Sequence, residues 1–299
     1  MELSGLIVDL QDRIRPLRDR LFPRELLLEL HDDMLRGQVL ADGVPGSVRF
    51  DCPLPPFTCR GGMPLEKEPL ADLIGDLLVR DGLLEAFLMV ALPAGAVQWR
   101  VLEWPNGQPL PTDPLEAVRE IDAASLRLPF GAADAVLDAQ PLPGAEPRVL
   151  VAASPRELVD AWIEVFSLAG TQLERLAPAQ SCEFLGLQPV LRPMARRDLL
   201  GLLSTHDGVT RFTLFRAGLP RFERTLAATG AALVSELKRS LDFYRRTDPE
   251  ARDLRLVHSD DLPEAAAIAA DLGARLEKLP TAPFDSLILR GLASLEVTA

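Results

Sequence analysis

The chain has 299 residues, of which 47% are hydrophobic and only 5% are aromatic. This composition is typical of a soluble globular protein long enough for two lobes, each with its own core. A formal net charge of −12 argues against nucleic acid or an anionic membrane surface as the direct partner, because both attract a basic face.

No signal for membrane insertion or secretion is found in the sequence. The longest apolar stretch, residues 87–97, contains Pro93 and is far shorter than the roughly 20 residues that cross a bilayer. The N-terminus lacks the basic start, apolar core and cleavage site of a secretory signal. The cysteines are odd in number and have no metal-binding spacing. We therefore expect a protein of the reducing cytoplasm.

The chain opens with an amphipathic pattern. Apolar residues recur at three- and four-residue spacing between Arg and Asp, which predicts a helix over residues 3–21 that Pro23 ends. Its apolar positions are Leu6, Ile7, Leu10, Ile14, Leu17 and Leu21. Such a helix either packs on the body of the protein or binds a partner.

Strands and helices then alternate up to about residue 188. We expect strands at 26–30 and 35–40, a loop-rich strand region at 43–62 and a helix at 70–84. A compact β-β-α-β-β-α pattern follows, with strands at 87–92, 97–104, 136–141 and 148–153 and helices at 115–126 and 155–169. Ser154 is the expected N-cap of the second of these helices, and Gly170 is its expected end. A helix over 176–187 then returns to the first lobe.

The second lobe is expected after residues 189–197, a proline- and arginine-bearing connection. Strands are predicted at 199–203, 209–216 and 219–226, followed by a long helix at 230–246. A strand at 254–257, a helix at 263–272, a short strand near Leu276 and a last helix from Phe284 complete the pattern.

Each of the three histidines stands in an aspartate-containing turn just after an apolar strand. The turns are His31-Asp32-Asp33, His206-Asp207-Gly208 and His258-Ser259-Asp260-Asp261. The first two lead into a second strand and the third leads into a helix, which is the layout of the nucleotide cleft in actin-like folds. Those folds place glycine and hydroxyl residues in the turns, because backbone N–H groups must approach phosphates. The acidic turns of this chain are unsuited to a phosphate tail.

These observations predict an α/β protein with an actin-like (ribonuclease H-like) two-lobed fold and a small β-β-α-β-β-α insert in its first lobe. In such a fold the three histidines face one interlobe cleft, where hydrogen bonds to the neighbouring aspartates could tie the turns together.

Common catalytic signatures are missing from the sequence. It has no Gly-x-x-x-x-Gly-Lys loop, no Gly-x-Gly-x-x-Gly, no His-Glu-x-x-His and no Gly-x-Ser-x-Gly. The His/Asp turns could converge on zinc or manganese, but no single turn has ligand spacing, and Asp and His are ordinary turn residues. We expect no catalytic residue, no cofactor and no metal.

Several short stretches, in order, resemble the PilM family, the actin-like assembly proteins of type IV pili related to the cell-division protein FtsA. The most specific is Arg-Ser-Leu-Asp-Phe-Tyr at 239–244. Weaker matches lie at 90–93, 150–159, 215–220 and 291–293. The resemblance covers the chain from about Arg24 to its end.

The chain departs from the family in its nucleotide motifs. The family's first two turns read Asp-Ile-Gly, where this chain has the His31 and His206 turns, and its glycine-rich adenosine segment is replaced by Ser259-Asp260-Asp261. The family's insert before the helix at 239–244 is also missing. The resemblance therefore implies a pseudo-ATPase without the roofing subdomain.

The resemblance further implies a non-catalytic cytoplasmic scaffold of type IV pilus assembly, a machine that serves twitching motility or DNA uptake. Its partners would be the cytoplasmic tail of a PilN-type inner-membrane protein, which would hold it at that membrane, and other pilus assembly proteins. The alternatives are an actin-like ATPase with rewritten loops and a GspL-like cytoplasmic domain of a type II secretion system.

The expected domains are an N-terminal helix at 1–23, a first lobe at 24–188 with its insert at 88–170, and a second lobe at 189–299. The family's tail groove lies between the first lobe and the insert. By position, the partner-binding candidates are Trp99, Trp104 and Trp162, because aromatic residues dominate binding hot spots. Each of them could equally be a core residue.

Overall fold

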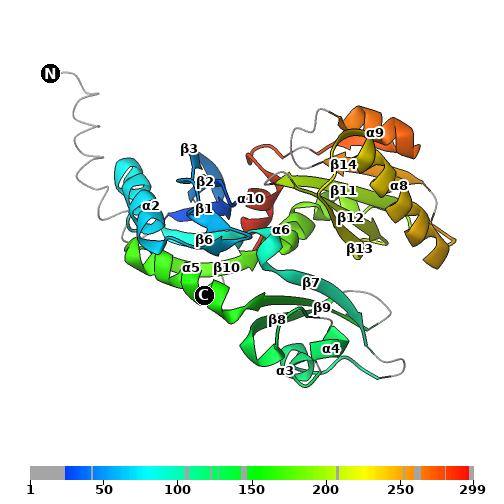
Figure 1. Cartoon of the computed structure of the whole chain (residues 1–299), viewed down its shortest axis with the longest axis horizontal. Coiled ribbons are helices and arrows are strands. Elements are labelled where there is room, and N and C mark those ends of the chain that lie inside the picture. Colours follow the sequence, from blue (N-terminus) through cyan, green and yellow to red (C-terminus); the bar gives the residue numbers. More distant parts are fainter. Residues whose placement is uncertain are drawn as a thin grey trace. The chain divides into compact units, whose positions relative to one another are not determined.

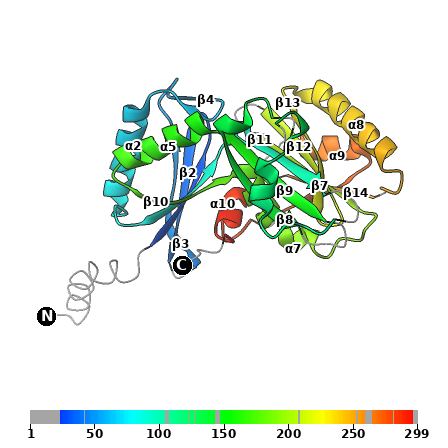
Figure 2. The same cartoon turned by 90° about the horizontal axis from the view of Figure 1, so that it is seen from below.

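The computed structural model describes residues 24–295, apart from 42, 105–107, 122, 127, 143–146, 207–208, 252, 259–263 and 280. The helix expected over residues 3–21 therefore lies outside the described residues. The chain forms two compact units (Figures 1 and 2). The first comprises Met1–Val97, Asp134–Val136 and Ser154–Ala179, and the second comprises Gln98–Ala133, Leu137–Ala153 and Gln180–Ala299.

A five-stranded sheet with the order β10-β6-β1-β2-β3 forms the centre of the first unit. Its strands are β1 (Glu25–Leu30), β2 (Met34–Ala41), β3 (Val44–Pro53), β6 (Phe87–Leu92) and β10 (Gln172–Pro178). β1, β2 and β3 are antiparallel, whereas β6 and β10 run parallel to β1. β1 and β6 are almost continuously apolar and buried, as expected of central parallel strands, and β3 alternates at the edge.

Two helices and a small hairpin complete the first unit. Helix α2 (Lys67–Asp81) packs against α5 (Arg156–Leu168), and α5 also contacts β5 and β10 (Figure 1). The hairpin consists of β4 (Cys59–Arg60) and β5 (Met63–Pro64). The buried face of α5 follows the helical repeat, with Leu158, Ala161, Trp162, Val165 and Phe166 turned inward.

The second unit repeats the same sheet topology, with the order β13-β12-β11-β14-β15. Its strands are β11 (Leu199–His206), β12 (Val209–Arg216), β13 (Leu219–Leu226), β14 (Leu254–His258) and β15 (Arg275–Lys278). Again the first three strands are antiparallel and the last two run parallel to β11. Helices α8 (Gly230–Thr247) and α9 (Ala265–Leu272) share one apolar core with this sheet. The repeat is one of topology that no internal sequence repeat reveals.

Close helix packing explains a stretch that the family resemblance singles out. Helices α6 (Ala179–Gly186) and α10 (Leu287–Leu292) approach so tightly that a Cβ at Gly291 would lie 1.8 Å from the carbonyl oxygen of Cys182. At Gly186 it would lie 2.6 Å from the carbonyl oxygen of Leu287. Both positions therefore require glycine. A short helix, α7 (Gln188–Leu191), follows α6.

The insert is a three-stranded sheet of order β7-β9-β8 with short helices on it. It consists of β7 (Gln98–Glu103), α3 (Pro114–Arg119), α4 (Ala123–Leu126), η2 (Ala132–Asp134), β8 (Ala135–Leu142) and β9 (Arg148–Pro155). Most of it groups with the second unit rather than the first, because Trp99 and Leu150 share a core with Phe184 and Phe215. β6 and α5, which we assigned to the insert, belong to the first unit, since β6 pairs with both β1 and β10.

Three details of the sequence prediction are wrong. Residues 172–178 form β10, where the helix prediction starts at Leu176. The single helix expected over 115–126 is two short helices, α3 and α4. The Ser154 hydroxyl does not cap α5; it donates to the carbonyl oxygen of Ala96 at 2.9 Å. Across the described residues, no helix combines the length and the apolar character needed to cross a membrane.

Candidate functional site

The first His/Asp turn connects β1 to β2 and is held by its own side chains. The Asp32 carboxylate accepts hydrogen bonds from the backbone N–H groups of Gly61 and Gly62, the latter at 2.7 Å. The Cys59 thiol lies 3.5 Å from the same carboxylate. Asp33 is exposed. Asp32 thus fastens the turn to the β4–β5 hairpin.

Paired N–H groups of this kind are a typical anion-binding arrangement. Gly61 and Gly62 have φ angles of +60° and +81°, a conformation that L side chains rarely adopt. A Cβ at Gly62 would also lie 2.7 Å from the Cβ of Ala96. Consecutive N–H groups in such a turn form a concave site for negative charge. In this chain the anion is the carboxylate of Asp32 itself.

His31 points into the protein and pairs with an acid on the preceding strand. Its Nε2 lies 2.7 Å from Oε1 of Glu29, and the two residues are only 4% and 1% exposed. Arg36 on β2 lies 3.9 Å from the same Glu29 oxygen and also pairs with Asp51 at 2.7 Å. A buried pair of this kind needs hydrogen bonding to offset its desolvation. The arrangement ties the ends of β1, β2 and β3 together.

The other two histidines end neighbouring parallel strands of the second unit. His206 is the last residue of β11 and His258 is the last residue of β14, in which it lies opposite Leu203 of β11. His258 is half-buried. Asp207, Asp260 and Asp261 lie outside the described residues. Since His31 belongs to the other unit, the expectation that all three histidines face one cleft stays a prediction.

A buried polar network that the sequence prediction missed lies behind the β11–β12 turn. Glu183 of α6 accepts hydrogen bonds from Ser204 (2.5 Å) and from Arg211, and all three are at most 5% exposed. Arg211 also lies 3.8 Å from Glu223, which accepts a hydrogen bond from Thr213. Burial raises the pKa of Glu223, although the charge of Arg211 opposes this. The network joins α6 to β11, β12 and β13, and only the polar residues within apolar strands hinted at it.

We find no metal-binding group in the part of the chain that the structure describes: nowhere in it do three or more His, Cys, Asp or Glu side chains gather to hold an ion. In the first turn, His31 pairs with Glu29, and Asp32 accepts hydrogen bonds from Gly61 and Gly62.

The three tryptophans have different surroundings. Trp162 is fully buried, and its Nε1 donates to the carbonyl oxygen of Gly62 at 2.8 Å. Trp99 is 8% exposed and packs against Phe184 with ring centroids 6.1 Å apart. Trp104 is half-buried at the edge of the insert's apolar core. Their partner-binding role stays a prediction, but only Trp104 has substantial surface to offer a partner.

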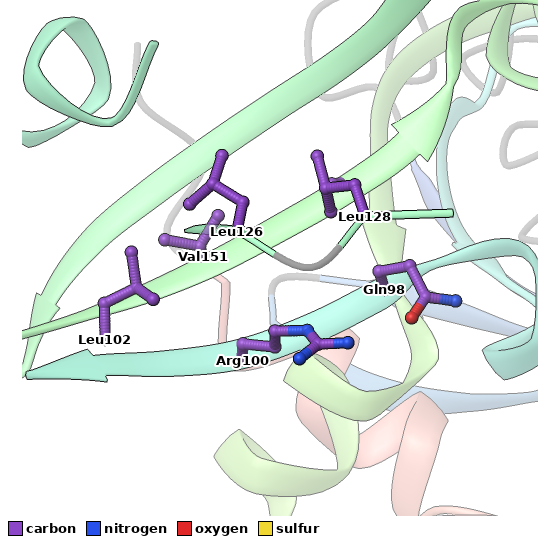
Figure 3. A pocket seen from close by; sticks show the side chains of 7 residues that line it. Gln98, Arg100, Leu102, Leu126, Leu128 and Val151 are labelled. Carbon is purple, nitrogen blue, oxygen red and sulfur yellow. The ribbon is translucent and has the colours of Figure 1, made fainter. Parts of the chain in front are cut away.

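The opposite face of β7 carries a small, largely apolar hollow. Gln98, Arg100 and Leu102 alternate with Trp99 and Val101 along the strand, so they point to the other side of the sheet. Val151 of the neighbouring strand β9 lines the same face of the sheet, and Leu126 of α4 and Leu128 lie over it, as Figure 3 shows. It lies within the insert's core and is lined mainly by aliphatic side chains.

An exposed apolar surface surrounds the β4–β5 hairpin and was not predicted. Phe57 is 90% exposed with a φ angle of +66°, which is rare for a bulky side chain. Leu65, whose N–H donates to the carbonyl oxygen of Thr58 at 2.7 Å, is 53% exposed. Ile163 of α5, next to Trp162, is 45% exposed. We call Phe57, Leu65 and Ile163 the hairpin surface.

No protein-family model matches the chain, and no curated protein matches it with significance. Solved structures do match. The PilM-PilN type IV pilus biogenesis complex is 23% identical, with 90% of this chain and 97% of that chain covered at a TM-score of 0.73. A protein from Bacteroides thetaiotaomicron with an actin-like ATPase fold and unknown function is 9% identical, with 91% and 96% covered at a TM-score of 0.58. The cytoplasmic domain of EpsL, an inner membrane component of the type II secretion system of Vibrio cholerae, is more distant, with 13% identity, 91% and 93% covered and a TM-score of 0.49.

These likenesses confirm the predicted fold class. The chain has an actin-like fold, and its two five-stranded sheets of identical strand order are the duplicated cores of that fold.

Proposed function

We propose that this protein is a PilM-like cytoplasmic scaffold of type IV pilus assembly that binds the cytoplasmic tail of a PilN-type inner-membrane protein. The observation that carries the proposal is the structural likeness to the PilM-PilN complex, which extends over nearly the whole length of both chains. The fold alone is shared with proteins of many activities, so the argument also depends on the chemistry of the turns and the surface.

The first turn supports a role without nucleotide. The Gly61 and Gly62 N–H groups, which could receive an anion, are already bonded to Asp32. A phosphate would have to displace this carboxylate and lie near its charge, and like charges repel by about 1 kcal/mol even in a watery environment. The rival function is an actin-like ATPase with rewritten loops. The fold favours it, but the N–H groups of Gly61 and Gly62 are already bonded to Asp32, which disfavours phosphate binding there.

The charge of the chain suits a membrane-protein tail. Cytoplasmic segments next to membrane spans are enriched in Lys and Arg. A scaffold with a net charge of −12 attracts such a segment and is repelled by the anionic membrane surface, which leaves it dependent on its partner for membrane association.

Within the described residues, the hairpin surface and Trp104 are our candidate anchors for the tail. Anchors in binding hot spots are typically aromatic or large side chains that are exposed before binding. Phe57 offers the most exposed side chain of this kind, and its left-handed backbone holds it outward. Trp104 is the tryptophan whose side chain is partly exposed to solvent. Trp99 and Trp162 are buried, so truncating either one would remove core packing.

The test is a fluorescence-anisotropy titration with a labelled synthetic peptide that copies the cytoplasmic tail of the PilN-type protein from the same genome. We expect saturable binding, weakened about 30-fold by Phe57→Ala, which corresponds to a hot-spot contribution of about 2 kcal/mol. Trp104→Ala tests the tryptophan separately. Phe243→Ala is the matched control, because Phe243 is a 59% exposed aromatic residue on α8 of the other unit.

The outcomes separate the function from the anchor. If the folded wild-type protein binds no tail peptide, the scaffold proposal is wrong. If the peptide binds equally to the wild type, Phe57→Ala and Trp104→Ala, the scaffold proposal stands and the anchors lie elsewhere.

A further inference from the structure

The N-terminal segment enters the first unit at a defined place. The Arg24 guanidinium donates a hydrogen bond to the carbonyl oxygen of Gly82, which caps the C-terminal end of α2. The Phe87 N–H donates to the carbonyl oxygen of Arg24 at 2.9 Å. The parallel registers place the first residues of β1, β6 and β10 at one edge of the sheet. Arg24, the first described residue, therefore lies at the start of β1, beside the end of α2.

Exposed apolar side chains gather around the same place. Val79 in the last turn of α2 is 61% exposed, Leu84 just beyond it is 48% exposed, and Leu168 at the end of α5 is 53% exposed. The two helices adjoin here, since a Cβ at Gly75 would lie 3.7 Å from the carbonyl oxygen of Ala169. A group of exposed aliphatic residues on one unit is typical of a surface that something covers. We call Val79, Leu84 and Leu168 the α2–α5 surface.

The charges on this side of α2 identify the kind of segment that fits. Asp72, Asp76 and Val79 are all exposed and follow one another at four- and three-residue spacing, so they share one face of the helix. Glu85 is exposed next to Leu84. The exposed Arg80 beside Val79 pairs with Asp81 at 2.8 Å, so the charges left to a partner at the border of this surface are mainly those of Asp72, Asp76 and Glu85. Residues 13–20 of the N-terminal segment have the complementary charge, because they contain Arg13, Arg15, Arg18 and Arg20 and a single acid, Asp19.

We propose that the chain's own N-terminal segment docks on the α2–α5 surface, with Leu17 and Leu21 against the aliphatic side chains and the arginines beside the acids. The reach suffices, since the three residues from Leu21 to Arg24 span up to about 10 Å. Residues 17–21 are the part of the segment nearest to Arg24 in the sequence, so they are the part that can reach this surface. The covalent connection gives an effective concentration in the millimolar range, which favours this segment over a separate partner. The inference is independent of the proposed function.

Hydrogen exchange followed by mass spectrometry on the full chain tests the proposal. We expect peptides from residues 3–21 to exchange at least about tenfold more slowly in the wild type than in Val79→Asp or Leu168→Asp. Leu17→Asp, which changes only the segment, should release the same protection. Val44→Asp is the matched control: Val44 is 63% exposed on β3, so its replacement should leave the protection unchanged.

The proposal is overturned if residues 3–21 exchange at the rate of a free peptide in the wild type. Protection that Val79→Asp, Leu168→Asp and Leu17→Asp all leave intact would equally overturn it, because the segment would then be held elsewhere. The protection could also disappear on dilution while light scattering shows a dimer at the higher concentration. The α2–α5 surface would then bind a second copy of the chain, which would contradict docking within one chain.

Discussion

At the scale of single residues, an acid in a turn can bond to backbone N–H groups of its own chain, and Asp32 does so. Its carboxylate accepts two backbone N–H groups of the Gly61-Gly62 turn, whereas the neighbouring Asp33 is exposed. The residue type was visible in the sequence, but its partners lie about 30 positions away. No local pattern connects them, so the sequence could suggest a structural turn without naming the hairpin that it holds.

We predict that Asp32→Ala lowers the free energy of unfolding by about 2 kcal/mol, because two backbone donors lose a charged acceptor. Asp33→Ala should change it by less than about 0.5 kcal/mol, because surface substitutions away from such contacts have small effects. Urea denaturation of both variants measures the difference. Equal effects of the two substitutions would show that the Asp32 bonds do not stabilise the turn.

A second residue-scale prediction concerns pH. Hydrogen bonding from Arg255, at 3.1 Å from its Nε, lowers the pKa of Glu277, with smaller contributions from the charges of Arg255 and Arg275. Because the folded-state pKa lies below the unfolded value, the pair stabilises the protein above the unfolded pKa, and this stability is lost as the pH falls through the folded pKa. Glu277→Gln should therefore cost up to about 1 kcal/mol at pH 7 and progressively less in acid.

The stability of Glu277→Gln relative to the wild type is measured by urea denaturation between pH 3 and pH 7. The same measurement in an Arg255→Gln background is the control: the Glu277→Gln effect should be smaller there, because the hydrogen-bond donor is gone. A Glu277→Gln effect that stays constant, or grows as the pH falls, would contradict the assigned pair.

At the scale of elements, the sequence predicted most strands and helices because their periodicity is strong. β1, β6 and β11 are largely apolar, β14 buries Leu254, Leu256 and Val257, and α8 has a regular buried stripe. β10 was missed because Gln172–Pro178 mixes charged and apolar residues and leads directly into α6. Ser154 was misassigned because a serine before a proline and a helix is typical of a cap, whereas its hydroxyl reaches Ala96, 58 positions away.

The contact between α6 and α10 gives a prediction at this scale. Gly291→Ala should lower the free energy of unfolding by about 3 kcal/mol, since the new methyl group overlaps the backbone of Cys182 and the helices must move apart. Gly95→Ala is the control, because a Cβ there meets no atom within 4 Å. Thermal unfolding of both variants checks the prediction, and equal melting temperatures would contradict the close packing.

At the scale of the whole molecule, the two units have the same sheet topology although their sequences differ. The three histidine turns indicated an actin-like fold because the order of strands, turns and helix around them is that of the fold. This order can be recognised even though the turns lack the glycines that actin-like folds place there. The grouping of the insert with the second unit could not be read from the sequence, since it depends on Trp99 and Leu150 packing with residues 34 or more positions away. The anchors that we propose for a partner could not be chosen from the sequence either, because the exposure of Phe57 and the burial of Trp162 are properties of the folded chain.

We propose that an actin-like protein with this sequence binds a membrane-protein tail instead of a nucleotide. Isothermal titration calorimetry of one wild-type preparation, first with Mg-ATP and then with the PilN-type tail peptide, tests both halves. We predict saturable heat with the peptide and none with Mg-ATP up to millimolar concentration. The opposite result would be micromolar binding of Mg-ATP, turnover that Asp207→Ala abolishes, and no heat from the peptide. It would show a nucleotide-binding protein that does not bind the tail.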